Sequence, residues 1–331
     1  MGVNSKNMFP LNRNRRLRSK SSLRNLVRES SLSPNDFIVP LFICEGEKIK
    51  EEIKSMPEYY RLSLDNLKKE VRELWGIGIQ AILLFVKVPD KLKDNAGSEA
   101  VNEDGLMQRA IKEIKNTVPE ITIMTDIALD PYSIHGHDGI VKNNLILNDE
   151  TNEVLSKMAL SHAMSGADVL APSDMMDGRV LAIRQELEKN GFHDTSIMSY
   201  SAKYASSFYG PFRDALGSKP GFGDKKTYQM DIGNRTEAIK EALSDIEEGA
   251  DILMIKPGIA YLDIVRDIKN TINVPLAVYQ VSAEYAMVKA GARLGWINHD
   301  EIMMEQLNSI KRAGANMIVS YFAKEAIKLI S

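Results

Sequence analysis

Short apolar runs rich in β-branched residues recur along the chain, and segments with helical periodicity separate them. Eight runs are predicted to be buried strands: Phe37–Cys44, Gln80–Val86, Ile121–Ile127, Asp168–Ala171, Ser196–Ser201, Asp251–Lys256, Pro275–Tyr279 and Asn316–Ser320. The amphipathic segments between them predict helices at Leu64–Trp75, Glu103–Asn116, Glu153–Ser165, Arg179–Lys189 and Thr236–Glu248. Because parallel strands need crossover helices, the alternation predicts a parallel sheet.

A joint between helix and strand repeats within this pattern. Residues 165–170, 248–253 and 313–318 share one form, in which a glycine ends a helix, a small residue follows and a strand begins. Eight strands with this joint predict an α/β fold of the (β/α)8 TIM-barrel class. A doubly wound sheet is the alternative, and it is less favoured because no G-x-G-x-x-G motif follows the first strand.

Residues with reactive or polar side chains gather where the predicted strands end. They are Asp126, Ser173, Asp174, Lys203, Lys256, Tyr279, Ser282 and Tyr321. TIM-barrel active sites lie at the carboxyl ends of the strands, so the barrel brings these side chains to one mouth.

Two lysines carry most of the candidate chemistry. Lys203 ends the run Ser-Tyr-Ser-Ala-Lys, and Lys256 ends the run Met-Ile-Lys before Pro-Gly. Desolvation or a second cation nearby lowers the pKa of a lysine and leaves a free amine that forms Schiff bases with carbonyl compounds. The plain alternative is a lysine that extends from a strand end into water. One such lysine indicates an aldolase-like enzyme, and two indicate an enzyme that holds two carbonyl compounds.

The segment from about residue 208 to 229 is rich in glycine and proline, which predicts a long loop that acts as a lid. It carries the cations Arg213, Lys219, Lys225 and Lys226. Cations over an amine site suit a carboxylate substrate. We expect Lys219 and Lys226 to face water.

The loop after the third predicted strand is dense in oxygen and imidazole groups. Asp126, Asp130 and Asp138 suit a hard cation such as Mg²⁺, or they cap the loop. His135 and His137 form a His-x-His pair typical of metal-dependent hydrolases, but such sites need further histidines, and only 5 exist in the chain. The sequence therefore disfavours a histidine-based dinuclear site.

Composition narrows the choice of function. The 331 residues carry a net charge of −3 with 44% hydrophobic content, so neither nucleic acid nor membrane is expected as a partner. No apolar run reaches the length of a membrane span. The single cysteine, Cys44, excludes an intrachain disulfide and any zinc site built from several cysteines, and it fits a reducing compartment.

The first residues differ from the rest because they are rich in arginine, lysine and serine and nearly free of acids. We expect residues 1–33 to form an arm that wraps a partner subunit, with a short helix near residues 23–27, and residues 34–331 to form one catalytic domain. A transit peptide is the alternative interpretation of the basic segment. The expected location is accordingly the cytoplasm, as in bacteria, with organellar targeting kept open.

Several long strings resemble the porphobilinogen synthase family, also called 5-aminolevulinate dehydratase. They are Arg15–Arg18, Leu32–Pro34, Ala171–Arg179, both lysine motifs, Tyr279–Met287 and Ser320–Phe322. The resemblance spans nearly the whole chain. It implies the condensation of two 5-aminolevulinate molecules into porphobilinogen, with loss of two waters, in tetrapyrrole and haem biosynthesis.

The resemblance also assigns roles to residues. Lys256 would form the Schiff base at the P site and Lys203 the one at the A site, with Asp126 and Ser173 beside them in proton transfer and positioning. The implied substrate-binding residues are Ser282, Tyr321, Tyr279 and Phe208, with Arg213, Lys225 and Gln229 on the A side. Lys225 stands where arginine is frequent in the family, so it would bind the substrate carboxylate as a point charge.

One departure from many family members concerns the metal. Ala128, Asp130 and Asp138 stand where those members hold zinc with three cysteines, so the resemblance implies the zinc-independent branch. The active-site cation would be Mg²⁺, a monovalent ion or absent. Glu241 matches the ligand of an allosteric Mg²⁺, and the arm implies dimers that assemble into an octamer, in exchange with smaller forms. A single-imine lyase and a catalytically silent barrel are the alternatives.

Overall fold

The computed structural model describes residues 9–330, and the chain divides into two compact units at Ser31 and Leu32. In the first unit, the described residues form a 3-10 helix, η1 (Asn14–Arg18), and a short helix, α1 (Ser21–Leu26), and neither contains a buried residue. The short helix predicted near residues 23–27 is therefore present, displaced toward the N-terminus. The predicted arm begins in residues 1–8, which lie outside the described residues.

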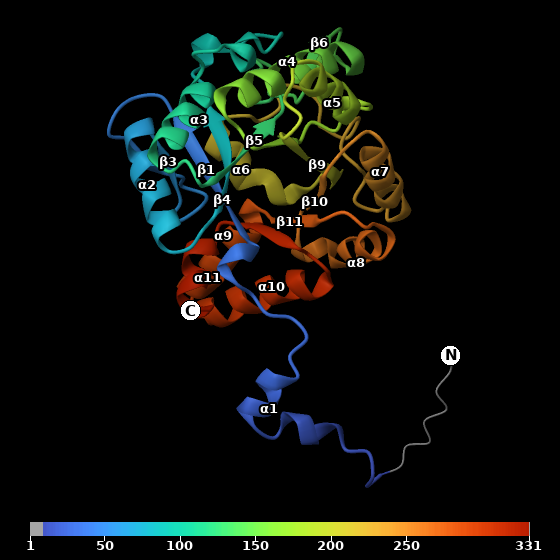
Figure 1. Ribbon diagram of the computed structural model, residues 1–331. Helices are drawn as coiled ribbons and strands as arrows, with labels where there is room; N and C mark the ends of the chain where they lie inside the picture. The colour runs from blue at the N-terminus through green and yellow to red at the C-terminus, as the bar shows by residue number, and fades with distance from the viewer. Residues whose placement is uncertain (1–8, 331) are drawn as a thin grey trace. The chain divides into compact units, whose positions relative to one another are not determined.

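The second unit is a closed barrel of eight parallel strands (Figure 1). The strands are β1 (Phe37–Cys44), β4 (Ala81–Lys87), β5 (Thr122–Ile127), β8 (Val169–Pro172), β9 (Ser196–Lys203), β10 (Ile252–Lys256), β11 (Leu276–Gln280) and β12 (Met317–Ser320). The last strand pairs with the first, with Phe37 opposite Ile318, and this closes the sheet. The predicted TIM barrel is confirmed, and an open doubly wound sheet is excluded.

Helices surround the barrel (Figure 1). They are α2 (Leu64–Gly76), α3 (Leu106–Thr117), α4 (Asn148–Ser165), α5 (Arg179–Lys189), α7 (Thr236–Glu247), α8 (Leu262–Thr271), α9 (Ser282–Arg293), α10 (His299–Ala313) and α11 (Ala323–Ile330). The five predicted helices are confirmed, but α4 begins before the predicted Glu153. Its first turn contains Asp149 and Glu150, whose charges favour a helix N-terminus.

The repeated glycine joint is confirmed at all three positions. Gly166, Gly249 and Gly314 follow their helices with φ of +105°, +103° and +128°, a backbone region that L side chains rarely adopt. At Gly314 an added Cβ would also lie 2.6 Å from Cγ of Lys269. The joint thus lets each helix turn directly into the next strand.

Two pairs of short antiparallel strands decorate the loops and were not predicted. β2 (Lys50–Glu52) pairs with β3 (Tyr60–Leu62), which continues the sheet beside β1, and β6 (Ile140–Lys142) pairs with β7 (Leu145–Leu147). Each strand has three residues, too few for a period-two pattern to emerge from the sequence.

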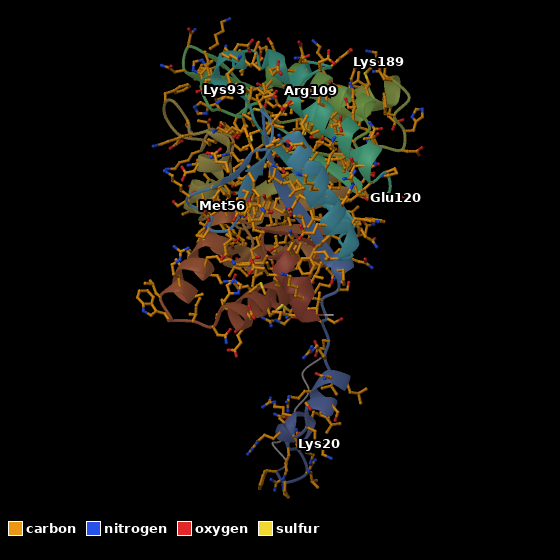
Figure 2. All side chains as sticks on the ribbon, turned by 90° about the vertical axis from the view of Figure 1, so that its left-hand side faces the viewer. Lys20, Met56, Lys93, Arg109, Glu120 and Lys189 are labelled. Atoms are coloured by element: carbon orange, nitrogen blue, oxygen red, sulfur yellow. The ribbon has the colours of Figure 1, made fainter. Side chains whose placement is uncertain are left out.

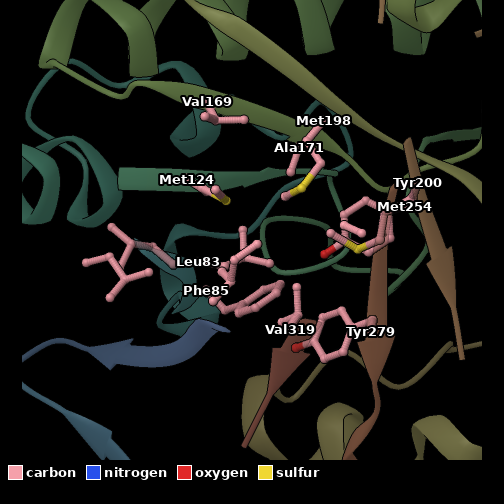
Figure 3. Packing of buried hydrophobic residues seen from close by; sticks show 14 of the residues in the cluster. Leu83, Phe85, Met124, Val169, Ala171, Met198, Tyr200, Met254, Tyr279 and Val319 are labelled. Atoms are coloured by element: carbon pink, nitrogen blue, oxygen red, sulfur yellow. The ribbon is translucent and has the colours of Figure 1, made fainter. Parts of the chain in front are cut away.

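The barrel interior is filled by apolar and aromatic side chains from several strands, including Phe85, Tyr200, Met254 and Tyr279 (Figure 3). Charged side chains such as Glu120 and Lys189 are exposed on the outside (Figure 2). None of the helices in residues 9–330 is long and apolar enough to cross a membrane.

An irregularity in strand pairing determines which way Lys203 points. Between Ser199 and Ala202, β9 advances three residues while β10 advances two, from Leu253 to Ile255. An extra residue in one strand reverses the alternation of side chains beyond it. Lys203 therefore lies on the same face as Tyr200 and reaches the barrel mouth.

Candidate active site

The two candidate lysines end neighbouring strands and lie side by side. Lys203 is the last residue of β9, Lys256 is the last residue of β10, and the two are paired in register. They are only 6% and 4% exposed. Two amines are thus buried in one mouth at the carboxyl ends of the strands.

Aromatic rings surround the amine of Lys256. Its Nζ lies 4.5 Å from the ring centre of Tyr279, 4.6 Å from that of Phe212, 5.1 Å from that of Tyr200 and 5.2 Å from that of Tyr209. These four rings form an aromatic box that excludes water from the amine. The faces of the rings still accommodate a cation. The amine is therefore dry but can carry the positive charge of an iminium.

Burial and the nearby Lys203 cation lower the pKa of Lys256 to about 7, against the opposing carboxylates of Asp126, Asp130 and Asp138. An ordinary lysine is almost fully protonated at neutral pH. A substantial fraction of Lys256 is therefore a free amine at neutral pH, as a nucleophile requires.

Lys203 lies in more polar surroundings than Lys256. Its Nζ donates a hydrogen bond to the carbonyl of Ser173 and lies 3.7 Å from Oδ2 of Asp138. The ring centre of Tyr200 is 5.9 Å away. The same tyrosine ring thus lies near both amines, and among residues 9–330 a carboxylate lies within ion-pair distance of Lys203 but not of Lys256.

Asp126 supplies a buried carboxyl group close to the lysines. Burial and the neighbouring Asp130 raise the pKa of Asp126 to about 7, while the two lysines and the Ser173 hydroxyl oppose the rise. Its Oδ1 has no hydrogen-bond partner in the part of the chain that the structure describes. A carboxyl that titrates near neutral pH can both donate and accept a proton during turnover.

A second group of charges joins the loop after β5 to the predicted lid. Lys225 Nζ donates to Oδ1 of Asp138 at 2.9 Å and lies 3.6 Å from Oδ2 of Asp130. Gln229 Nε2 lies 3.5 Å from Oδ2 of Asp138. Burial alone would raise the pKa of Asp138, but the Lys203 and Lys225 cations hold it at about 2.

The same carboxylates are the candidate ligands of an active-site cation. Asp130 and Asp138 converge on the Lys225 ammonium, so they suit a positive partner, and the chain already supplies one. Within residues 9–330, no group of three or more His, Cys, Asp or Glu side chains is arranged to hold a metal ion. A metal at these two carboxylates would have to compete with Lys225.

Both ring nitrogens of His137 are engaged within the protein. Nδ1 lies 3.0 Å from the hydroxyl of Tyr228, and Nε2 lies 3.1 Å from the carbonyl of Phe222. The carbonyl can only accept, so Nε2 carries the proton and Nδ1 accepts from Tyr228. His137 therefore fastens the lid segment instead of offering a free metal ligand.

The predicted lid is not an irregular loop throughout. It includes part of a 3-10 helix, η5 (Ser207–Tyr209), and all of a short helix, α6 (Gly210–Leu216). The prediction of loop is wrong there because Pro211 occupies the first helical turn, where proline is tolerated, and Gly217 ends the helix with φ of +64°.

The cations of the lid segment divide between water and protein. Lys219 and Lys226 are exposed, as predicted, whereas Lys225 is buried and Arg213 is half-buried.

The lid also packs closely on the loop after β5. A Cβ added to Gly136 would lie 2.4 Å from the carbonyl oxygen of Lys219, so the two backbones touch.

Hydroxyl groups line the side of the mouth formed by β11 and β12. The hydroxyls of Tyr279 and Tyr321 lie 2.9 Å apart. Ser282 Oγ accepts a hydrogen bond from the Phe212 amide at 3.0 Å and lies 3.5 Å from the carbonyl of Phe208. These groups form a polar edge beside the aromatic box of Lys256.

Comparison with known proteins identifies the family. Residues 11–329 match the family model described as Delta-aminolevulinic acid dehydratase. The chain belongs to the delta-aminolevulinic acid dehydratase family. It is 52% identical over 320 residues to the protein of that name from Bacillus subtilis (strain 168), covering 97% of this chain and 98% of the relative. The Methanothermus sociabilis protein of that name is 53% identical over 322 residues, covering 97% and 99%.

A solved structure of the family agrees in fold. The delta-aminolevulinic acid dehydratase of Toxoplasma gondii ME49, crystallised in complex with the reaction product porphobilinogen, superposes with a TM-score of 0.95 at 49% identity. The match covers 96% of this chain and 91% of the Toxoplasma chain.

Glu241, which the sequence predicts as a Mg²⁺ ligand, lies on α7 and not at the strand ends that carry the two lysines. It lines a cavity of about 760 Å³ together with Asp177, Asp231 and Glu237. Burial and nearby carboxylates, Asp245 first among them, raise the pKa of Glu241. A cation there would relieve the repulsion, and one carboxylate with a shell of waters suits Mg²⁺.

Two features of the site were not predicted from the sequence. The first is the aromatic box, of which Tyr200 and Tyr209 lie within or beside the Lys203 motif. The second is a buried network in which Arg179 pairs with Asp174 at 3.6 Å and Asp245 at 3.3 Å. Strand alternation by itself would place Tyr200 on the face opposite Lys203, because the irregularity between Ser199 and Ala202 leaves no sign in the sequence. The network joins residues from separate elements, and no spacing within the chain reveals it.

Proposed function

We propose that the chain condenses two molecules of 5-aminolevulinate into porphobilinogen, with loss of two waters, as a lyase of tetrapyrrole biosynthesis. The observation that carries the proposal is the pair of buried lysines at the ends of β9 and β10, with a titratable carboxyl beside them. Membership of the family supports the same reaction.

Lys256 begins the chemistry because its amine is partly free at neutral pH. The nitrogen attacks the ketone carbon of one substrate, and the carbonyl oxygen leaves as water. The resulting iminium withdraws electrons, so the adjacent carbon loses a proton more easily. Asp126 is the group we assign to that proton transfer, with Ser173 holding its orientation.

Lys203 tethers the second substrate in the same way. With both ketones bound, a bimolecular condensation becomes a local reaction between held partners. One C–C bond and one C–N bond form between the two molecules. Both lysine nitrogens are released, so the balance is two substrates in, and one pyrrole and two waters out.

The remaining polar groups hold the substrate carboxylates. Ser282 and Tyr321 would bind one carboxylate, with Tyr279 and Phe208 completing that side of the pocket. Arg213, Lys225 and Gln229 would bind the other carboxylate from the lid. Because Lys225 is paired with Asp138 before substrate is bound, the incoming carboxylate replaces or shares that partner. Closure of the lid excludes water, which would hydrolyse the imines.

The direct test is incubation of the purified protein with 5-aminolevulinate and a colorimetric assay for the pyrrole. We expect porphobilinogen at one molecule per two substrate molecules consumed. A single-imine lyase would leave 5-aminolevulinate unconsumed, and a silent barrel would bind it without turnover. Either result from folded protein would contradict the proposal.

The reactivity of Lys256 is expected to depend on pH near neutrality. Only the deprotonated amine attacks a carbonyl, and the pKa of Lys256 is lowered to about 7. The rate at which borohydride traps 5-aminolevulinate on Lys256 should therefore rise with pH to a plateau, with a midpoint near 7. A midpoint close to the ordinary lysine value of 10.5 would contradict this.

We propose a zinc-independent enzyme that Mg²⁺ activates through a site at Glu241, with Mg²⁺ or a monovalent ion as the candidate cation near Asp130 and Asp138. The repulsion among carboxylates around Glu241 supports a cation there. Adding Mg²⁺ to metal-free enzyme should raise activity roughly 5-fold, in the usual range of coupling between sites.

Two comparisons test the metal proposal. Glu241→Ala should lose the response to Mg²⁺ and keep the metal-free rate, and a zinc-selective chelator should have little effect on the wild type. Complete inactivation by that chelator, reversed only by zinc, would refute the proposal.

We also propose that the chain assembles through its basic N-terminal arm into dimers and then an octamer, in exchange with smaller forms, and that it acts in the cytoplasm. The run of cations before Ser31 supports an arm that binds the surface of a partner subunit. The free thiol of Cys44 fits a reducing compartment. Light scattering on the full chain and on a chain that begins at Leu32 would test the role of the arm.

A further inference from the structure

Glu284 is a buried carboxylate that binds two loops at once. It lies in the first turn of α9 and is 4% exposed. Its Oε2 accepts the amide of Val281 at 2.6 Å, and its Oε1 accepts the amide of Ile259 at 2.5 Å. The amide of Gly258 lies 3.4 Å from Oε2.

Capping of α9 accounts for only one of these contacts. A glutamate in the first turn of a helix commonly accepts the amide of the residue before the helix, here Val281. The amides of Gly258 and Ile259 belong to a different loop, which follows β10 directly after Lys256 and Pro257. Glu284 therefore connects the end of β10 to the end of β11.

The two loops carry the two ends of one substrate site. The loop after β10 begins at Lys256, which the proposed function assigns to the Schiff base. The loop after β11 leads into Ser282, which it assigns to the substrate carboxylate. The spacing of these two groups sets where the bound ketone lies relative to the amine.

We propose that Glu284 is a positioning residue that holds the Lys256 turn against the Ser282 turn and so sets the geometry of imine formation. The inference rests on the proposed function. Glu284 lies among backbone donors and acts through Lys256 and Ser282 without contact with the reacting atoms.

The ionised carboxylate is the form that fits this role. Within residues 9–330, the hydrogen-bond partners of Glu284 are backbone N–H groups, and an N–H can only donate. Burial raises the pKa of Glu284 to about 7, and the amides of Val281, Ile259, Gly258 and Ala260 oppose the rise. A neutral amide in place of the carboxylate would turn its own N–H groups toward these donors and lose at least one bond.

The test is Glu284→Gln, followed by borohydride trapping with 5-aminolevulinate and quantification of adducts on Lys256 and Lys203 by peptide mass mapping. We expect the initial rate of adduct formation on Lys256 to fall by about 10- to 100-fold, as for a misplacement of about 1 Å, with the rate on Lys203 changed less than 2-fold. A variant that only folds less well would lose both adducts in the same proportion.

Asp251→Asn is the matched control. Asp251 directly precedes β10, the strand that Lys256 ends, and so lies away from the barrel mouth. It accepts the Ile197 amide at 2.8 Å and pairs with Arg184 at 2.5 Å. We expect this variant to lower thermal stability and to leave the ratio of the two adducts at the wild-type value. The same shift in ratio for Asp251→Asn would overturn the proposal.

A second variant covers a failure of Glu284→Gln to fold. Glu284→Asp keeps the negative charge. Its shorter side chain should still reach the Val281 amide within the helix turn but no longer reach the Ile259 amide. It should show the same selective loss on Lys256 to a smaller degree. Wild-type adduct rates in either folded variant would refute the positioning role, whereas no Lys256 adduct in the wild type would refute the proposed function itself.

Discussion

Replacement of Lys256 by alanine is expected to lower kcat by a factor on the order of 10⁴ or more, because the variant has no amine to form the first Schiff base. The fold should survive, since the lost group is a costly buried amine and the aromatic box of Tyr279 and Phe212 remains. We expect a melting temperature within about 5 °C of the wild type, measured beside steady-state formation of porphobilinogen.

Lys289→Ala is the matched control for this variant. Lys289 also lies near aromatic rings, with Nζ 5.5 Å from the ring centre of Tyr285 and 5.9 Å from that of Phe322, but it pairs with Glu58 and Glu325 outside the barrel mouth. It should lose stability and keep its turnover. Substantial activity in folded Lys256→Ala would remove the Schiff-base role from this residue.

Replacement of Lys203 by alanine is expected to lower kcat by roughly 10³-fold, because the second substrate loses its tether. Lys256 should still be trapped by borohydride. Its trapping midpoint should move to higher pH, since the Lys203 cation is one of the influences that lower the pKa of Lys256. Single-turnover trapping between pH 6 and 10 measures both effects.

Lys203→Arg separates the charge of Lys203 from its nucleophilicity. The guanidinium keeps a cation beside Asp138 but forms no imine under these conditions. We expect turnover as low as in the alanine variant. The midpoint of the pH dependence of trapping on Lys256 should stay close to the wild-type value. Near-normal turnover in either variant would favour a single-imine mechanism and contradict the two-lysine account.

The fold was largely predictable because its signals are local. Each of the eight strands is a short apolar run, and the predicted bounds differ from the observed ones by at most two residues. Gly166, Gly249 and Gly314 mark helix ends by a backbone conformation that other residues rarely adopt. The helix at 210–216 was missed because glycine and proline at its ends resemble loop composition.

Only the site residues at the ends of strands could be predicted from the sequence. Lys203 and Lys256 could be brought together because adjacent barrel strands end at one mouth. The contact of Lys225 with Asp138, 87 residues apart, and the two-loop contacts of Glu284 depend on how the loops fold over the mouth. Such contacts leave no periodic signal in the chain.

The different surroundings of the two lysines suggest an order of events. Lys256 lies in an aromatic box that favours the free amine, whereas Lys203 is held by Ser173 and Asp138. We therefore expect the first imine to form on Lys256. Substrate that displaces the contacts of Lys203 would then release the second amine.

Borohydride trapping with 5-aminolevulinate, followed by peptide mass mapping, would show directly whether both lysines form Schiff bases, with porphobilinogen assayed in parallel. We expect an adduct on Lys256 at low substrate concentration, a further adduct on Lys203 at higher concentration, and pyrrole formed by the untreated enzyme. Folded protein that yields no lysine adduct and no pyrrole, with Mg²⁺ present, would contradict this expectation.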